Sequence, residues 1–158
     1  MDDVAQVLGC ATIRSSSRTC SMQSFSHSFG DSTYHLWWIT KCRYKILRDR
    51  RHKYLCKDIL TGIAKRHSME IISLAIGDEH IHIAARLPPT LSISKAFQLL
   101  KGASSYVLFK AIPNFRLRYP RGHLWAIGGG FRSVGDVEKQ TVVDYVDRHN
   151  QLALTSFI

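Results

Sequence analysis

The sequence predicts an α+β fold: a ferredoxin-like antiparallel sheet of the split β-α-β type, with helices on one face and an added mobile helix at the C-terminus. Short β-branched and aromatic runs alternate with two longer stretches that carry apolar residues at helical spacing. Two of these runs are separated by only three residues, which predicts a hairpin, so the expected order is β-α-β-β-α-β-α. A length of 158 residues with 45% hydrophobic content suits one domain.

The first thirty residues differ in composition from the rest of the chain. Residues 14–28 hold seven serines and two arginines, and no hydrophobic period is sustained before residue 31. Because this composition is typical of a flexible segment, we expect a Ser-rich leader over residues 1–30, outside the fold, and a single domain over residues 31–158. One hypothesis places the natural start of the protein at Met22.

Two patterns predict the first strand and the first helix. Residues 33–40, TYHLWWIT, are β-branched and aromatic and predict a strand, which a basic turn at residues 41–45 ends. Apolar residues three and four positions apart predict a helix over residues 49–67.

A hairpin and a second helix follow. The apolar-rich runs at residues 69–76 and 80–87 flank a Gly-Asp-Glu turn at residues 77–79 and predict two paired strands. Apolar residues at helical spacing then predict a helix over residues 93–111, which Pro113 ends.

The C-terminal part predicts one strand and one helix. The glycine-rich residues 125–131 predict the strand, and we expect it to be floppy because three of its residues are glycines. Asp136 is a suitable N-cap for a helix over residues 137–150.

The charge of the chain indicates a polyanionic partner. Twenty-two Lys and Arg against twelve Asp and Glu give a formal net charge of +10, which favours phosphate contacts with nucleic acid or an anionic membrane surface. Since no single amphipathic segment collects the basic residues and no apolar run could cross a bilayer, we expect nucleic acid and no membrane. Four cysteines without a Cys-x-x-Cys pair, and no signal peptide, favour a cytoplasmic location.

Two histidines in the second hairpin strand form a candidate metal site. His80 and His82 flank Ile81, and strand alternation sends both imidazoles to one face of the sheet, where they could share a metal ion. The alternative is two polar residues on a solvated strand face. Asp78 and Glu79, which precede the pair, either orient an imidazole or simply form the turn.

The last predicted helix carries a tyrosine and a further histidine. Tyr145 and His149 fall one turn apart on the same face, so that this helix could deliver a phenol nucleophile and a third metal ligand together. A neutral phenol is a weak nucleophile until a metal or a base helps it to lose its proton. The alternative is a tyrosine that packs in the core or in an interface.

Six short stretches carry a resemblance to a known family. In chain order they are STYHLWWITKCRYK at 32–45, EHIHI at 79–83, KGASS at 101–105, HLWA at 123–126, VGDV at 134–137 and YVD at 145–147. In this order and spacing the sequence resembles the short tyrosine transposases of the HUH nuclease superfamily, the TnpA type carried by the smallest bacterial and archaeal insertion sequences. The resemblance covers residues 32–150.

The resemblance implies an enzyme that cleaves and rejoins single-stranded DNA at hairpin-marked element ends. It implies that His80 and His82 bind Mg²⁺ or Mn²⁺ and that Tyr145 attacks the scissile phosphate, which gives a 5′-phosphotyrosine and a free 3′-OH. The family often has Gln where this chain has His149, which would be a further metal ligand. Three imidazoles would shift the preference toward Mn²⁺, Co²⁺ or Zn²⁺.

The resemblance also implies partners. DNA hairpins would be bound by a homodimer in which each active site combines His80 and His82 of one protomer with Tyr145 of the other. Basic residues next to the matched stretches are interpreted as DNA contacts: Lys41, Arg43, Lys45, Lys101, Arg118 and Arg121. Three tyrosines among them could stack on unpaired bases: Tyr44, Tyr106 and Tyr119. For Tyr106, which follows the apolar face of the helix over residues 93–111, we expect core packing instead.

The chain departs from the family pattern near the predicted site. Glu79 stands where the family usually has Asp, and Ile-Gly-Gly-Gly at residues 127–130 replaces an arginine, a small residue and two aromatics. Two alternatives therefore stay open. The first is a catalytically decayed or host-adopted single-stranded nucleic-acid-binding protein. The second is a structural or hydrolytic zinc site formed by His80, His82 and His149.

Overall fold

The computed structural model describes residues 23–25, 28–30, 32–135, 141, 143–145 and 148. Its main sheet has four antiparallel strands in the order β4-β5-β3-β6. The strands are β3 (Thr33–Ile39), β4 (Glu70–Ile76), β5 (His80–Arg86) and β6 (Gly130–Ser133). This is the strand order of a ferredoxin-like fold, so the predicted fold class is confirmed.

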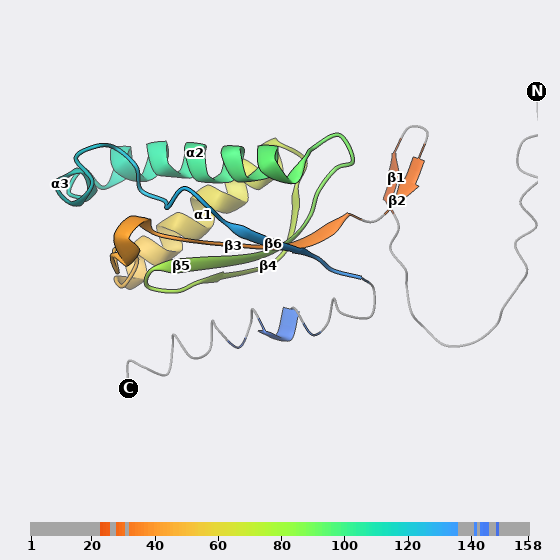
Figure 1. The fold of residues 1–158 in the computed structure, drawn as a ribbon, viewed down its shortest axis with the longest axis horizontal. Helices are drawn as coiled ribbons and strands as arrows, with labels where there is room; N and C mark the ends of the chain where they lie inside the picture. The colour runs from red at the N-terminus through yellow and green to blue at the C-terminus, as the bar shows by residue number, and fades with distance from the viewer. Residues whose placement is uncertain are drawn as a thin grey trace, which may run out of the picture.

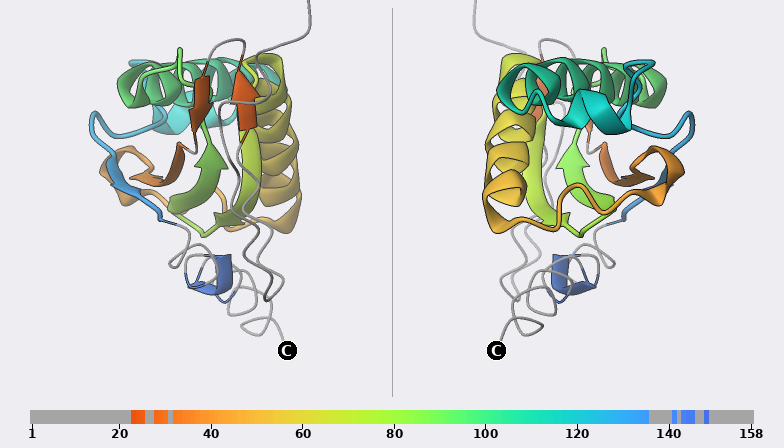
Figure 2. Two further views of the ribbon diagram at one scale, coloured as in Figure 1. Left: turned by 90° about the vertical axis from the view of Figure 1, so that its right-hand side faces the viewer. Right: turned by 90° about the vertical axis from the view of Figure 1, so that its left-hand side faces the viewer.

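Two long helices cover one face of this sheet (Figures 1 and 2). They are α1 (Arg50–Arg66) and α2 (Ile93–Ala111), which also pack against each other. Each begins at a side-chain cap, because Asp49 accepts a hydrogen bond from the Arg51 backbone N–H and Ser92 accepts one from the Lys95 N–H. Both helices therefore lie where the apolar spacing predicts them.

Two short helical segments lie outside the predicted helices. The first is a 3₁₀ turn, η1 (Lys41–Arg43), in which Cys42 and Arg43 adopt left-handed φ angles of 58° and 52°. The second is α3 (Phe115–Arg118), which starts within the turn that ends α2. Both are shorter than the window over which a hydrophobic period can be recognised.

Two strands lie within the expected leader. β1 (Gln23–Phe25) and β2 (Ser28–Gly30) pair antiparallel and form a two-stranded sheet of their own. Part of the range over which we expected no regular structure therefore forms strands, although outside the four-stranded sheet.

The core lies between the sheet and the two helices. Leu36 and Trp38 of β3 and Ile81 and Ile83 of β5 point to the helices and are at most 1% exposed. Fully burying a side chain of this size stabilises the fold by roughly 2 kcal/mol. Alternate residues of these strands thus form the core that stabilises the fold. The residues between them lie on the opposite face of the sheet.

The last strand of the sheet is not where the sequence predicts it. We expected a strand over residues 125–131, but Trp125 forms only an isolated bridge with Thr40, and β6 begins at Gly130. The physical reason is a lysine: Lys101 Nζ lies 2.7 Å from the carbonyl oxygens of both Ala126 and Gly128, so these groups bond to α2 instead of a neighbouring strand.

The glycines before β6 are closely packed. A Cβ atom at Gly130 would overlap the indole of Trp37, and one at Gly129 would overlap the ring of Phe97. These two positions have no room for a side chain because aromatic rings fill the space. The expectation of a floppy strand is therefore wrong for these two glycines.

The last predicted helix is described only in part. Residues 141, 143–145 and 148 are helical, within the predicted range of 137–150, whereas Asp136 and His149 lie outside the described residues. The described segment lies against the face of the sheet opposite α1 and α2 (Figure 1). Within the described part of the chain, no helix is long and apolar enough to cross a membrane.

Candidate active site

Two histidines of β5 occupy the sheet face that the helices leave uncovered. His80 and His82 are half-buried, their ring centroids are 5.3 Å apart, and their planes are inclined at 79°. Ile81, between them, is fully buried on the other face. Strand alternation therefore brings the two predicted metal ligands together as expected.

A third histidine joins them from β3. The antiparallel register pairs Trp37 with His82 and His35 with Ala84, so the His35 ring lies beside the His82 ring on the same face. His35 Nε2 is 3.0 Å from His82 Nδ1, and the rings meet edge to edge, nearly coplanar, with centroids 5.2 Å apart. Sequence reasoning did not single out His35, because its neighbour depends on a strand register that the sequence alone does not give.

Tyr145 approaches this face from the C-terminal helical segment. Its ring centroid is 5.8 Å from that of His82 and 6.2 Å from that of His35, and it meets both rings edge-on. The Tyr145 side chain remains 44% exposed, so its phenol is accessible to a large substrate. The predicted nucleophile and a predicted metal ligand thus lie side by side within one chain.

The chemistry of the donor set fits a divalent metal ion. Two half-buried imidazoles on one face, with centroids 5.3 Å apart, can direct a ring nitrogen each toward a common point. The predicted third ligand, His149, lies outside the described residues. Within the described residues, no group of three His, Cys, Asp or Glu side chains is placed to hold a metal.

An aromatic side chain closes the β6 side of the site. The Trp37 ring lies 5.0 Å from the His35 ring, and its indole fills the space above Gly130 on β6. Trp37 therefore contacts both His35 and β6.

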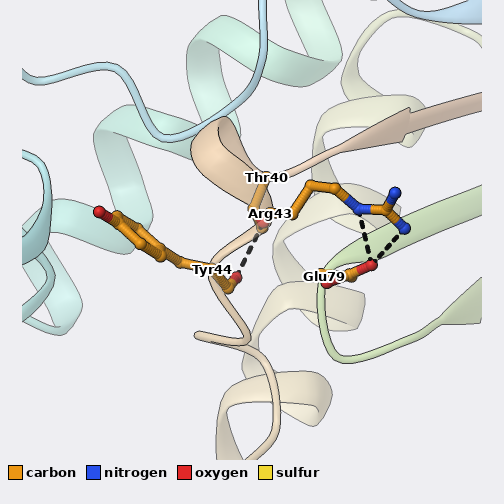
Figure 3. A network of polar contacts seen from close by, with 4 residues as sticks. All are labelled: Thr40, Arg43, Tyr44 and Glu79. Carbon is orange, nitrogen blue, oxygen red and sulfur yellow. Dashed lines mark hydrogen bonds and ion pairs between the residues drawn. The ribbon is translucent and has the colours of Figure 1, made fainter.

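Ion pairs anchor the turn that leads into His80. Arg43 donates to Glu79 Oε1 through Nε at 3.0 Å and Nη2 at 2.6 Å, and Lys53 Nζ lies 2.8 Å from Asp78 Oδ1 (Figure 3 shows the Arg43 pair). In Figure 3, Thr40 Oγ1 also donates to the Tyr44 carbonyl oxygen, at 2.8 Å. The two acidic residues before the histidine pair thus connect the hairpin to η1 and α1.

Two of the predicted DNA contacts, Lys41 and Arg118, belong to neighbouring segments. η1 and α3 lie side by side, since Tyr119 Oη donates to the Lys41 carbonyl oxygen at 3.2 Å and Arg118 lies 5.6 Å from the Tyr44 ring centroid. Burial raises the pKa of Tyr119 to about 12, so its hydroxyl stays a donor. We call Lys41, Tyr44 and Arg118 the basic surface. Lys45 is exposed just after it in the sequence. The Arg43 guanidinium points away from Tyr44 and pairs with Glu79 (Figure 3). Arg121 is exposed in the turn after α3.

Lys101 differs from the other predicted DNA contacts because its ammonium group binds backbone carbonyl groups of the same chain. Its ammonium group binds the two carbonyl oxygens before β6, and its burial lowers its pKa. The group therefore stabilises the loop, and a role toward DNA stays a prediction.

A family profile and two similar proteins indicate the same protein family. The family profile described as "Transposase IS200 like" matches residues 28–149. The ISDra2 transposase TnpA of Deinococcus radiodurans is 29% identical over 114 residues, which are 72% of this chain and 81% of the relative. The transposase for insertion sequence element IS200 of Salmonella typhimurium is 23% identical over 124 residues, which are 78% of this chain and 80% of the relative.

Solved structures show the same fold. A Deinococcus radiodurans protein described as a candidate transposase superposes with a TM-score of 0.67 at 26% identity, over 81% of this chain and 98% of that one. A REP-associated tyrosine transposase bound to a REP hairpin superposes with a TM-score of 0.55, over 79% of this chain and 70% of that one. At 13% identity, the second likeness concerns the fold alone.

Proposed function

Because this chain belongs to the IS200-like transposase family, we propose that it cleaves and rejoins single-stranded DNA through a covalent bond to Tyr145. The observation that carries the proposal is the contact of the Tyr145 ring with His82, on the sheet face that also holds His80. A tyrosine that only packed in the core would not remain 44% exposed beside a pair of imidazoles.

In the proposed reaction, Tyr145 is the nucleophile. Its phenol oxygen loses its proton and attacks the scissile phosphorus in line, so that an O–P bond forms to tyrosine. The bond from phosphorus to the 3′-oxygen breaks, and this oxygen takes up a proton to become a free 3′-OH. In the joining step a 3′-OH attacks the 5′-phosphotyrosine and releases the phenol. Since the tyrosine ester retains the phosphodiester energy, no nucleotide is hydrolysed.

His80 and His82 are the proposed metal-binding residues, as in an HUH-type nuclease. A bound divalent cation, Mg²⁺ or Mn²⁺ or the Co²⁺ or Zn²⁺ that imidazoles also accept, would polarise a phosphate oxygen and offset the charge that develops on it. The two rings hold their place because Ile81 anchors the strand in the core and the Arg43–Glu79 ion pair anchors the preceding turn. His149 remains a predicted further ligand.

The proposed substrate is single-stranded DNA whose element ends are marked by hairpins. The basic surface supports this, because its cations would contact phosphates and its exposed Tyr44 ring could stack on an unpaired base. The REP-associated relative, which has the same fold, was solved bound to a hairpin.

The test uses labelled single-stranded element ends with Mn²⁺ and looks for an SDS-resistant protein–DNA adduct. Tyr145→Phe should abolish both the adduct and cleavage while hairpin binding is unchanged. Tyr106→Phe is the matched control and should cleave normally. Tyr106 is 68% exposed on α2, so the expectation that it packs in the core is wrong. An adduct that persists in Tyr145→Phe would overturn the proposal. Hairpin binding without any adduct in the natural protein would indicate a non-catalytic binding protein instead.

The proposed homodimer has two possible arrangements of its sites. In the chain described here Tyr145 contacts its own His82, whereas the resemblance implies that it serves the partner's histidines. Mixing Tyr145→Phe chains with His82→Ala chains separates the two: cleavage returns in the mixture only if the sites are shared, because only then does the mixed dimer hold one complete site.

A further inference from the structure

His35 lies in direct contact with a proposed metal-binding residue and belongs to a different strand. Its Nε2 atom is 3.0 Å from His82 Nδ1, which is hydrogen-bond distance, and the two rings meet edge to edge with an interplanar angle of 23°. Resting on the proposed function, we infer that His35 is a positioning residue that selects the tautomer of His82 and orients its ring for metal binding.

Only one of the two imidazoles can supply the proton of this hydrogen bond. A hydrogen bond between two neutral imidazole nitrogens needs one N–H and one lone pair, so either His35 or His82 donates. If His35 Nε2 donates, the His82 proton lies on its Nε2 and that nitrogen has no lone pair for a metal. If His82 Nδ1 donates, its Nε2 carries a lone pair. Only the second arrangement is compatible with metal binding by His82 Nε2, and it requires His35 to accept.

The contacts of His35 hold its ring where it can accept a hydrogen bond from His82. Its ring is half-buried, packs 5.0 Å from the Trp37 ring, and Trp37 in turn is seated over Gly130. The β3–β5 register fixes the backbone on both sides of the pair. A ligating histidine commonly donates its other N–H to an acceptor that fixes its orientation, and losing such an acceptor weakens metal binding about 10- to 100-fold.

The first experiment measures Mn²⁺ affinity in the absence of DNA, by calorimetry or by electron paramagnetic resonance. His35→Ala should weaken binding about 10- to 100-fold, and His35→Gln should recover most of the loss, because the amide oxygen can accept from His82 Nδ1–H. His67→Gln, which removes an imidazole at the end of α1 in the helical layer, is the matched control and should bind normally. Unchanged affinity in His35→Ala would overturn the inference.

The second experiment reads the tautomer directly in the metal-free protein. Nitrogen-15 NMR of the imidazoles at about pH 8, where histidine is ordinarily neutral, should show the His82 proton on Nδ1, and a mixture of tautomers in His35→Ala. A His82 proton on Nε2 in the natural protein would overturn the inference. This readout needs neither metal nor cleavage, so failure of the proposed function and failure of the His35 inference are distinguishable.

Discussion

In the middle of β3 and β5, four residues face the helices and are at most 1% exposed: Leu36, Trp38, Ile81 and Ile83. On the opposite face, the alternating positions are half-buried and include His35, His80 and His82. Both sets come from the same two strands and alternate one by one. The first face packs against α1 and α2, and its burial stabilises the fold. The second face is not covered by these helices, so a substrate can reach its imidazoles. Substitutions at neighbouring positions should therefore have different effects: on one face they should lower the stability of the fold, and on the other they should lower the rate of DNA cleavage.

The largest expected effect separates these two faces. His82→Ala should lower the rate of DNA cleavage by more than about 100-fold, because it removes a proposed metal ligand. The free energy of unfolding should change by only about 1 kcal/mol, since the hydrogen bond to His35 and the ring contacts that are lost lie on a half-buried face. Ile81→Ala, one residue away, should show the reverse pattern: it opens a cavity in the core and should cost about 3 kcal/mol.

Urea denaturation and single-turnover cleavage, compared per folded molecule, measure the two effects. If Ile81→Ala lost as much cleavage per folded molecule as His82→Ala, the two faces would not be separable and the division of roles would be wrong.

A smaller effect is expected where β6 closes the open face. Gly130→Ala should lower the free energy of unfolding by about 2 kcal/mol, because the new Cβ overlaps the rigid Trp37 indole. Gly128→Ala is the control in the same stretch, since nothing lies within 4 Å of its Cβ position. Thermal or urea unfolding compares the two, and equal stability would mean that Trp37 is not seated on Gly130.

The smallest effect distinguishes two lysines that were both predicted to contact DNA. Lys101→Met should lower the free energy of unfolding by about 1 kcal/mol through the loss of two hydrogen bonds, and it should leave the salt dependence of DNA binding unchanged. Lys45→Met should leave stability unchanged and lower the slope of log affinity against log salt by about 1. The opposite result would make Lys101 the DNA contact.

The fold was predictable because its signals are local. The alternation around Ile81 placed both histidines of β5 on one face, and the spacing of apolar residues placed α1 and α2. β6 was misplaced because its start depends on Lys101, which lies on α2 and bonds to the carbonyl groups that a strand would need. No pattern within residues 125–131 reveals that contact.

The site was predictable only in part for the same reason. His80, His82 and Tyr145 belong to stretches with a recognisable pattern, and the structure brings His82 and Tyr145 together. His35 lies in a matched stretch as well, yet its contact with His82 depends on the register of β3 against β5. Arg43 was interpreted as a DNA contact, and its ion pair with Glu79 likewise joins residues from separate elements.

The seating of Trp37 on Gly130 also constrains how these two positions can change over time. A larger residue at position 130 would occupy the space that the Trp37 indole fills. A larger residue at position 130 becomes acceptable only after position 37 has become smaller. The two sites are thus expected to evolve as a pair, with the change at position 37 coming first.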